Sequence, residues 1–130
     1  MLILNLPYPP SVNSYWRAHG HRRFISKEGV AFKEKVADIC QERNVQRFDD
    51  DKRLYFEVIL FPRDRRVQDI DNRLKALFDA LEGYAYTSDS SIDVLIVQRG
   101  EIRKGGGCLV LIDEIDGTER NMLRMQSEQA

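Results

Sequence analysis

The sequence predicts a single α+β domain in which helices pack on one mixed sheet, and three observations support this. The chain has 130 residues, a length that suits one compact domain with a modest core. Four short stretches are rich in β-branched and other apolar residues, and two longer stretches repeat apolar residues at helical spacing. Their order is β-α-β-α-β-β, without repeats or a linker. We expect one domain over residues 1–116 and a polar tail over residues 117–130.

The first half of the chain predicts one strand and one helix. Residues 2–6 (LILNL) indicate a strand that ends at PYPP, because proline cannot donate a hydrogen bond to a neighbouring strand. Ser26 is a suitable N-cap for a helix that runs to about Asn44. Its apolar positions recur at i, i+4, i+7 and i+8, namely Phe32, Val36, Ile39 and Cys40.

The second half predicts a strand, a helix and two further strands. Residues 54–61 (LYFEVILF) form the first strand, which ends at Pro62. A helix is expected from Asp69 to Gly83, with an apolar stripe made of Ile70, Leu74, Leu77, Phe78 and Leu81. Residues 92–99 and 108–113 are the last strands, and GEIRKGGG between them indicates a hairpin connection. Its three glycines lack the strand–glycine–helix context of a phosphate-binding loop.

Composition excludes some classes of protein and leaves a nucleic-acid binder possible. No apolar run approaches the ~18 residues of a membrane span, and no signal-peptide pattern is present, so we expect a cytoplasmic protein. Cys40 and Cys108 form no C-x-x-C pair and are expected to be buried, reduced thiols. The net charge is −1, but six Lys/Arg face two acids between Arg17 and Lys35. These cations form either a basic face or ordinary solvated charges.

The stretch RRVQDIDNRLKALFDAL places carboxylates close together at the start of the second helix. Asp69 and Asp71 are spaced D-x-D, Lys75 follows Asp71 at i+4, and Asp89 lies beyond the helix end. Taken singly, they indicate a helix cap, an exposed ion pair and a turn residue. Taken together, the three carboxylates suit a Mg²⁺ or Mn²⁺ site, with the lysine placed to neutralise charge on a phosphoryl group.

Several motifs in order resemble the RusA family of Holliday junction resolvases, which are common in phages and prophages. They are LPYPPSVNSYWR, FISKEG, RRVQDIDNRLKALFDAL and YTSDSSI, and the resemblance extends from Leu6 to about Asp113. It implies a RusA-like fold and a homodimeric, Mg²⁺-dependent endonuclease that cuts four-way DNA junctions symmetrically, in DNA recombination and repair.

The resemblance also assigns residues. Asp69, Asp71 and Asp89 fall on the family's essential carboxylates and would hold Mg²⁺, or Mn²⁺ in its place. Lys75 falls on the catalytic lysine, and Asn72 matches an Asn for which we expect a supporting hydrogen-bonding role. Where the family often has paired aspartates, this chain has Ser88 before Asp89.

Aromatic and basic residues are interleaved near the N-terminus, a pattern that suits stacking on bases together with phosphate contacts. Including the basic pair ahead of the D-x-D motif, the residues expected to contact junction DNA are Asn13, Tyr15, Trp16, Arg17, Arg22, Arg23, Lys27, Arg65 and Arg66. The alternative is that Tyr15 and Trp16 hold a loop against the core while the cations face water.

Three other functions remain open from the sequence. Asp93, Glu101 and Arg103 faintly resemble the Asp…Glu-x-Lys metal site of other nucleases. The second alternative is a non-catalytic DNA-binding module or inactive prophage remnant of the same fold. A metal-dependent phosphohydrolase for small nucleotides would need a closed, base-sized pocket.

Overall fold

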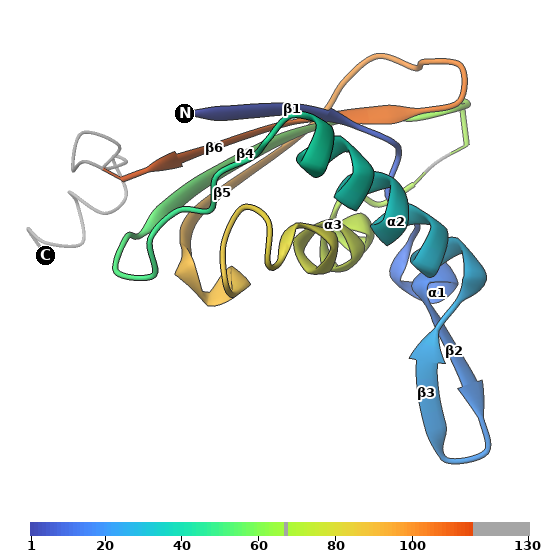
Figure 1. Cartoon of the computed structure of the whole chain (residues 1–130). Coiled ribbons are helices and arrows are strands. Elements are labelled where there is room, and N and C mark those ends of the chain that lie inside the picture. Colours follow the sequence, from blue (N-terminus) through green and yellow to red (C-terminus); the bar gives the residue numbers. More distant parts are fainter. Residues whose placement is uncertain (67, 116–130) are drawn as a thin grey trace, which may run out of the picture.

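The computed structural model describes residues 1–66 and 68–115, which form a four-stranded mixed sheet with two helices on one face (Figure 1). Its strand order is β1-β6-β4-β5, and β4 pairs parallel with β5 and antiparallel with β6. The strands are β1 (Leu2–Leu6), β4 (Leu54–Phe61), β5 (Ile92–Arg99) and β6 (Gly107–Glu114). The prediction of an α+β domain with a mixed sheet is confirmed. Among the described residues, no helix is long and apolar enough to cross a membrane.

Two helices form in the predicted segments, but their first and last residues differ from the prediction. Helix α2 (Lys27–Glu42) begins after the expected N-cap, Ser26, and ends two residues before Asn44, which has a positive φ of 50°. Helix α3 (Leu74–Leu81) is shorter than expected and follows a 3-10 turn, η1 (Asp71–Arg73). The predicted helix start at Asp69 is therefore wrong, because the chain enters the helix through a tighter turn.

The core lies between the helices and one face of the sheet. In β4, every second residue is at most 2% exposed, namely Leu54, Phe56, Val58 and Leu60. Both cysteines are free and buried, as predicted. Burial raises the pKa of the Cys108 thiol to about 12, so this thiol stays protonated at neutral pH.

The predicted hairpin between the last two strands is wrong. β5 and β6 lie on opposite sides of β4, so their connection crosses the end of that strand. The Gly100 amide donates to the Leu60 carbonyl at 2.8 Å, and the Arg103 amide donates to the Pro62 carbonyl at 2.8 Å. These bonds fix the connection on β4 and leave both edges of β4 paired.

A short hairpin that the sequence did not predict projects from the body of the protein (Figure 1). A single helical turn, α1 (Val12–Tyr15), leads into β2 (Trp16–His19), which pairs antiparallel with β3 (Arg22–Ile25). Gly20, with φ of 62°, supplies the positive φ that the two-residue turn requires. We call residues 16–25 the arm.

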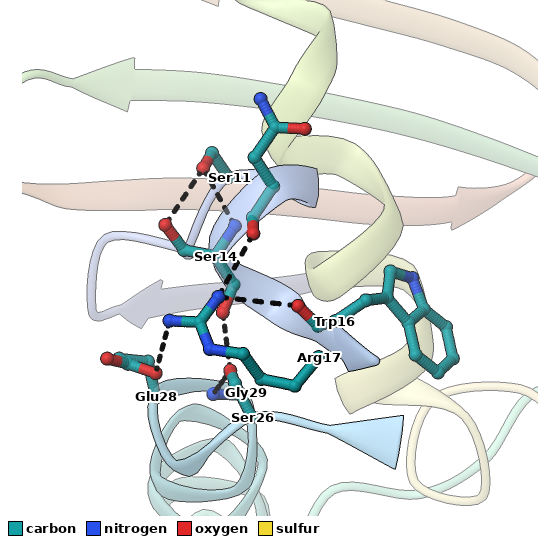
Figure 2. A network of polar contacts seen from close by, with 8 residues as sticks. Ser11, Ser14, Trp16, Arg17, Ser26, Glu28 and Gly29 are labelled. Atoms are coloured by element: carbon teal, nitrogen blue, oxygen red, sulfur yellow. Dashed lines mark hydrogen bonds and ion pairs between the residues drawn. The ribbon is translucent and has the colours of Figure 1, made fainter. Parts of the chain in front are cut away.

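Ser26 ties the base of the arm to helix α2 (Figure 2). Its hydroxyl accepts a hydrogen bond from the Gly29 amide at 3.1 Å and donates one to the Ser14 carbonyl. Arg17 adds a bond to the Asn13 carbonyl at 3.3 Å and an ion pair with Glu28 at 3.8 Å. The arm is therefore fixed at its base while its tip faces solvent.

Replacing Gly29 by alanine is expected to destabilise the protein, although alanine favours a helix interior by up to ~1 kcal/mol. A Cβ at this position would lie 2.6 Å from Ile25 Cγ2 and 2.9 Å from Tyr15 Cδ1, in fully packed surroundings. We expect Gly29→Ala to lower the free energy of unfolding by about 1–3 kcal/mol in urea denaturation. Alanine at the exposed Glu34 of the same helix is the control. Equal stability of both variants would show that the arm can shift without cost.

Candidate active site

The D-x-D carboxylates are solvent-exposed and unengaged. Asp69 precedes η1 and Asp71 begins it, and neither carboxylate makes a hydrogen bond or ion pair with residues 1–66 or 68–115. Neither η1 nor α3 has a side-chain cap bond, so the alternative of Asp69 as a helix cap is wrong. Beside them, Asn72 Oδ1 is buried without a hydrogen-bond partner among the described residues. A buried polar group of this kind is usually satisfied by a bound water or another donor.

The backbone before Asp69 is held from several sides. Tyr8 Oη donates to Gln68 Oε1 at 2.9 Å, and Arg73 Nη2 donates to the same oxygen. The Gln68 carbonyl accepts a hydrogen bond from Arg99 at 2.5 Å. Arg73 also donates to the Pro9 carbonyl at 2.6 Å. These contacts place the residue next to Asp69, so they orient the D-x-D segment.

A second set of carboxylates gathers at the far end of α3. Ligand oxygens of Asp79, Glu82 and Asp89 all lie within 4.8 Å of one another. Lys75 Nζ lies 3.1 Å from Asp79 Oδ1, so the lysine pairs with Asp79. The alternative of an exposed ion pair between Asp71 and Lys75 is therefore wrong. We call these four residues the α3 cluster.

The α3 cluster keeps its lysine charged. The pKa of Lys75 is raised, chiefly by the hydrogen bond to Asp79 and its charge, with smaller contributions from Asp89 and Glu82. A raised pKa favours the ammonium form at neutral pH. Lys75 can therefore stabilise negative charge but cannot act as a general base there.

Buried tyrosines lie behind the α3 cluster. Burial raises the pKa of Tyr15 to about 12, and the charges of Asp79 and Glu82 add to the effect. Tyr86 is shifted in the same direction, mainly by burial and then by Asp89. Tyr15 is fully buried, so the prediction that it contacts DNA is wrong: it anchors the base of the arm against the core.

The structure brings together only part of the predicted metal set. Asp89 belongs to the α3 cluster, whereas Asp69, Asp71 and Asp89 do not form a group of that tightness within the described chain. Asp79 and Glu82 were missed from the sequence. Their signal was present, because Lys75, Asp79 and Glu82 are spaced i, i+4 and i+7 and share one helix face.

The other predicted DNA-contacting residues lie in two places. Arg65 and Arg66 line a cavity of about 230 Å³ together with Asp69 and Arg99, so basic groups flank one of the candidate ligands. The others lie on or beside the arm, with exposed side chains at Asn13, Arg17, Arg22, Arg23 and Lys27. The guanidinium carbon of Arg23 lies over the ring of half-buried Trp16, 5.1 Å from the ring centroid.

The rival metal site is not assembled. Asp93 pairs with Arg53 at 2.6 Å, and Glu101 pairs with Arg103 at 3.5 Å. Within residues 1–66 and 68–115, the carboxylates of the α3 cluster are the one acidic group of metal-binding tightness. The histidines of the arm, His19 and His21, belong to no such group within the same ranges.

Comparison with proteins of known family identifies the family of this chain. The family model of Endodeoxyribonuclease RusA matches residues 7–110, a range that includes the D-x-D motif, Lys75 and Asp89. The chain is 37% identical over 113 residues to the crossover junction endodeoxyribonuclease rusA of Enterobacteria phage HK97, covering 85% of this chain and 92% of that protein. It is 32% identical over 114 residues to the RusA of Escherichia coli K12, covering 86% and 93%. The chain therefore belongs to the RusA family of endodeoxyribonucleases.

Proposed function

We propose that this protein is a divalent-metal-dependent endonuclease that resolves four-way DNA junctions by paired, symmetric nicks. The observation that carries the proposal is the match over residues 7–110, which spans every carboxylate and the lysine of the candidate site. Relatives at 32–37% identity are named crossover junction endodeoxyribonucleases. Work on DNA inside the cell would place the protein in the cytoplasm.

The donor set fits Mg²⁺, with Mn²⁺ as the alternative ion. Hard carboxylate oxygens are the ligands that these ions prefer, and we assign this role to the exposed Asp69 and Asp71 and the half-buried Asp89. The unpartnered Asn72 Oδ1 beside Asp71 supports a site that is completed from outside. When bound, the ion would polarise the scissile phosphate and favour ionisation of the attacking water.

Residues of the chain would stabilise charge, position the ligands and bind the DNA backbone. Lys75, kept charged by Asp79, would stabilise negative charge on the phosphoryl oxygens. The contacts around Gln68 would hold Asp69 in place and so reduce the reorganisation needed when substrate binds. Arg65 and Arg66 would hold the DNA backbone beside Asp69.

We also propose a homodimer. A four-way junction has approximate two-fold symmetry, and a symmetric dimer supplies one active site to each of two strands. In the described chain Asp69, Asp71 and Asp89 do not form a group within 4.8 Å, and a carboxylate from a second protomer is one way in which a dimer would complete the ligand set.

The test is incubation of the protein with a synthetic mobile four-way junction and a matched linear duplex, with and without Mg²⁺. We expect symmetric nicks in the junction only, and only with the ion. Binding to the junction without nicking in Mg²⁺ or Mn²⁺ would favour the non-catalytic alternative. Equal cutting of the junction and the linear duplex would refute the proposed specificity for four-way junctions.

A further inference from the structure

We propose that the cavity between the N-terminal loop and helix α2 binds one backbone phosphate of the DNA, through Lys35, Arg63 and Arg73. The proposal rests on the proposed function and adds a phosphate contact away from the catalytic carboxylates. The cavity has a volume of about 320 Å³. Its polar lining consists of Tyr8, Ser11, Ser14, Lys35, Arg63 and Arg73, with Glu28 at one side.

The charge of this cavity is strongly unbalanced. Three cations line it against one carboxylate, and that carboxylate, Glu28, already pairs with Arg17 at 3.8 Å. Within the described ranges, Lys35, Arg63 and Arg73 have no acidic partner at ion-pair distance. A concave site with excess positive charge attracts an anion.

Arg73 supplies an independent observation. Its side chain is only 6% exposed, and its Nε is buried without a hydrogen-bond partner among the described residues. A buried charge without a counter-charge is costly, and an anion in the cavity would provide that counter-charge.

Arg63 and Arg73 also repel each other. Their guanidinium carbons lie 5.6 Å and 4.2 Å from the centroid of the same Tyr8 ring, so two like charges lie beside one aromatic side chain. An oxyanion bound by both groups would convert this repulsion into two charge-assisted hydrogen bonds. Guanidinium pairs bind the oxygens of phosphate in this way.

The position of the cavity selects the source of the phosphate. Ser11 and Ser14 lie at the base of the arm (Figure 2), and Arg73 belongs to the turn that starts at Asp71. A strand that contacts both the arm and the D-x-D segment would therefore pass this cavity. We accordingly assign the bound group to the DNA backbone and not to a free phosphate or nucleotide.

The test uses the full chain with Lys35→Gln, Arg63→Gln and the double variant, because both side chains are at the rim and their loss leaves the core intact. Junction affinity is measured by electrophoretic mobility shift or fluorescence anisotropy at several salt concentrations. Each lost phosphate contact lowers the slope of log K against log salt by about 0.9, so we expect a decrease of about 1 in the double variant. Lys52→Gln, in the loop before β4, removes one charge away from the cavity and should keep the slope.

A second measurement identifies the source. Inorganic phosphate is titrated into wild type and double variant by NMR, with and without junction DNA. Displacement of the phosphate signal by junction, together with the reduced slope, supports the proposal. Tight binding of inorganic phosphate that junction does not displace would overturn the DNA assignment. An unchanged slope with no difference between variants in the phosphate titration would overturn the site.

These measurements do not depend on cleavage. If the protein binds the junction but never nicks it, the proposed enzymatic function fails, while the salt slope still reports on this cavity. If nicking is normal and the double variant keeps the wild-type slope, only the phosphate site fails.

Discussion

Asp71→Asn is expected to abolish junction cleavage, lowering the rate by orders of magnitude, while the protein stays folded. Asn keeps the size of Asp but loses the charge that binds a divalent cation. The Asp71 side chain is exposed and makes no hydrogen bond or ion pair with the described residues, so the fold loses no side-chain contact with the charge. Junction binding should be unchanged or tighter, because one negative charge facing the phosphates is removed.

Three measurements check this variant: single-turnover nicking of a labelled junction, junction affinity and thermal unfolding. Asp51→Asn, in the loop before β4, removes an equally exposed carboxylate and serves as the control. Cleavage by Asp71→Asn at near the wild-type rate would refute the assignment of Asp71 to the metal site.

The structure also removes the simplest competing explanation for a loss of activity. If Asp71 and Lys75 formed an exposed ion pair, its removal would cost a few tenths of a kcal/mol and would free the lysine. Lys75 is instead held by Asp79, and its raised pKa arises mainly from that contact. The lysine therefore keeps its charge and its partner in Asp71→Asn, so a loss of cleavage reports on the carboxylate.

The parts of the fold that local sequence encodes were predictable. Ser26 caps α2 as expected, and the alternating burial of β4 follows from its run of apolar residues. The strand order was not predictable, because the pairing of strands depends on contacts between residues that are distant in sequence. GEIRKGGG has hairpin composition, yet β6 pairs with both β1 and β4 and leaves β5 outside.

The arm escaped prediction for a different reason. Its strands WRAH and RRFI are only four residues long and expose nearly every side chain, so they carry no buried apolar face that would mark a strand. They are held at the base by the buried Tyr15 and Ser26. A two-stranded element without its own core depends on such anchoring, which no local pattern reveals.

The sequence predicted the candidate site residues that belong to a motif, but not which of them lie close together in the fold. D-x-D and Asp89 are visible in the sequence, whereas the approach of Asp89 to Asp79 and Glu82 depends on the turn that follows α3. The same limit applies to Arg73, which appears in sequence as one more surface cation and is buried in the structure.

Asp89→Asn should lose cleavage to the same extent as Asp71→Asn, and it should also change the stability of the protein in a metal-dependent way. Three carboxylates within 4.8 Å repel one another when no ion is bound, and Lys75 compensates only part of their charge. Removing one of them should raise the free energy of unfolding in EDTA by a few tenths of a kcal/mol. In wild type, an ion that binds the folded state raises the melting temperature, and this rise should shrink in Asp89→Asn.

Glu82→Gln is the matched comparison, because it removes a carboxylate from the same group and leaves the predicted ligands intact. We expect it to gain similar stability in EDTA, to keep the Mg²⁺-dependent rise in melting temperature and to cleave the junction within a few-fold of wild type. Loss of cleavage and of the Mg²⁺ response in both variants would instead place the ion on Asp79, Glu82 and Asp89. Normal cleavage by Asp89→Asn would exclude both sets, since Asp89 is the one carboxylate that they share.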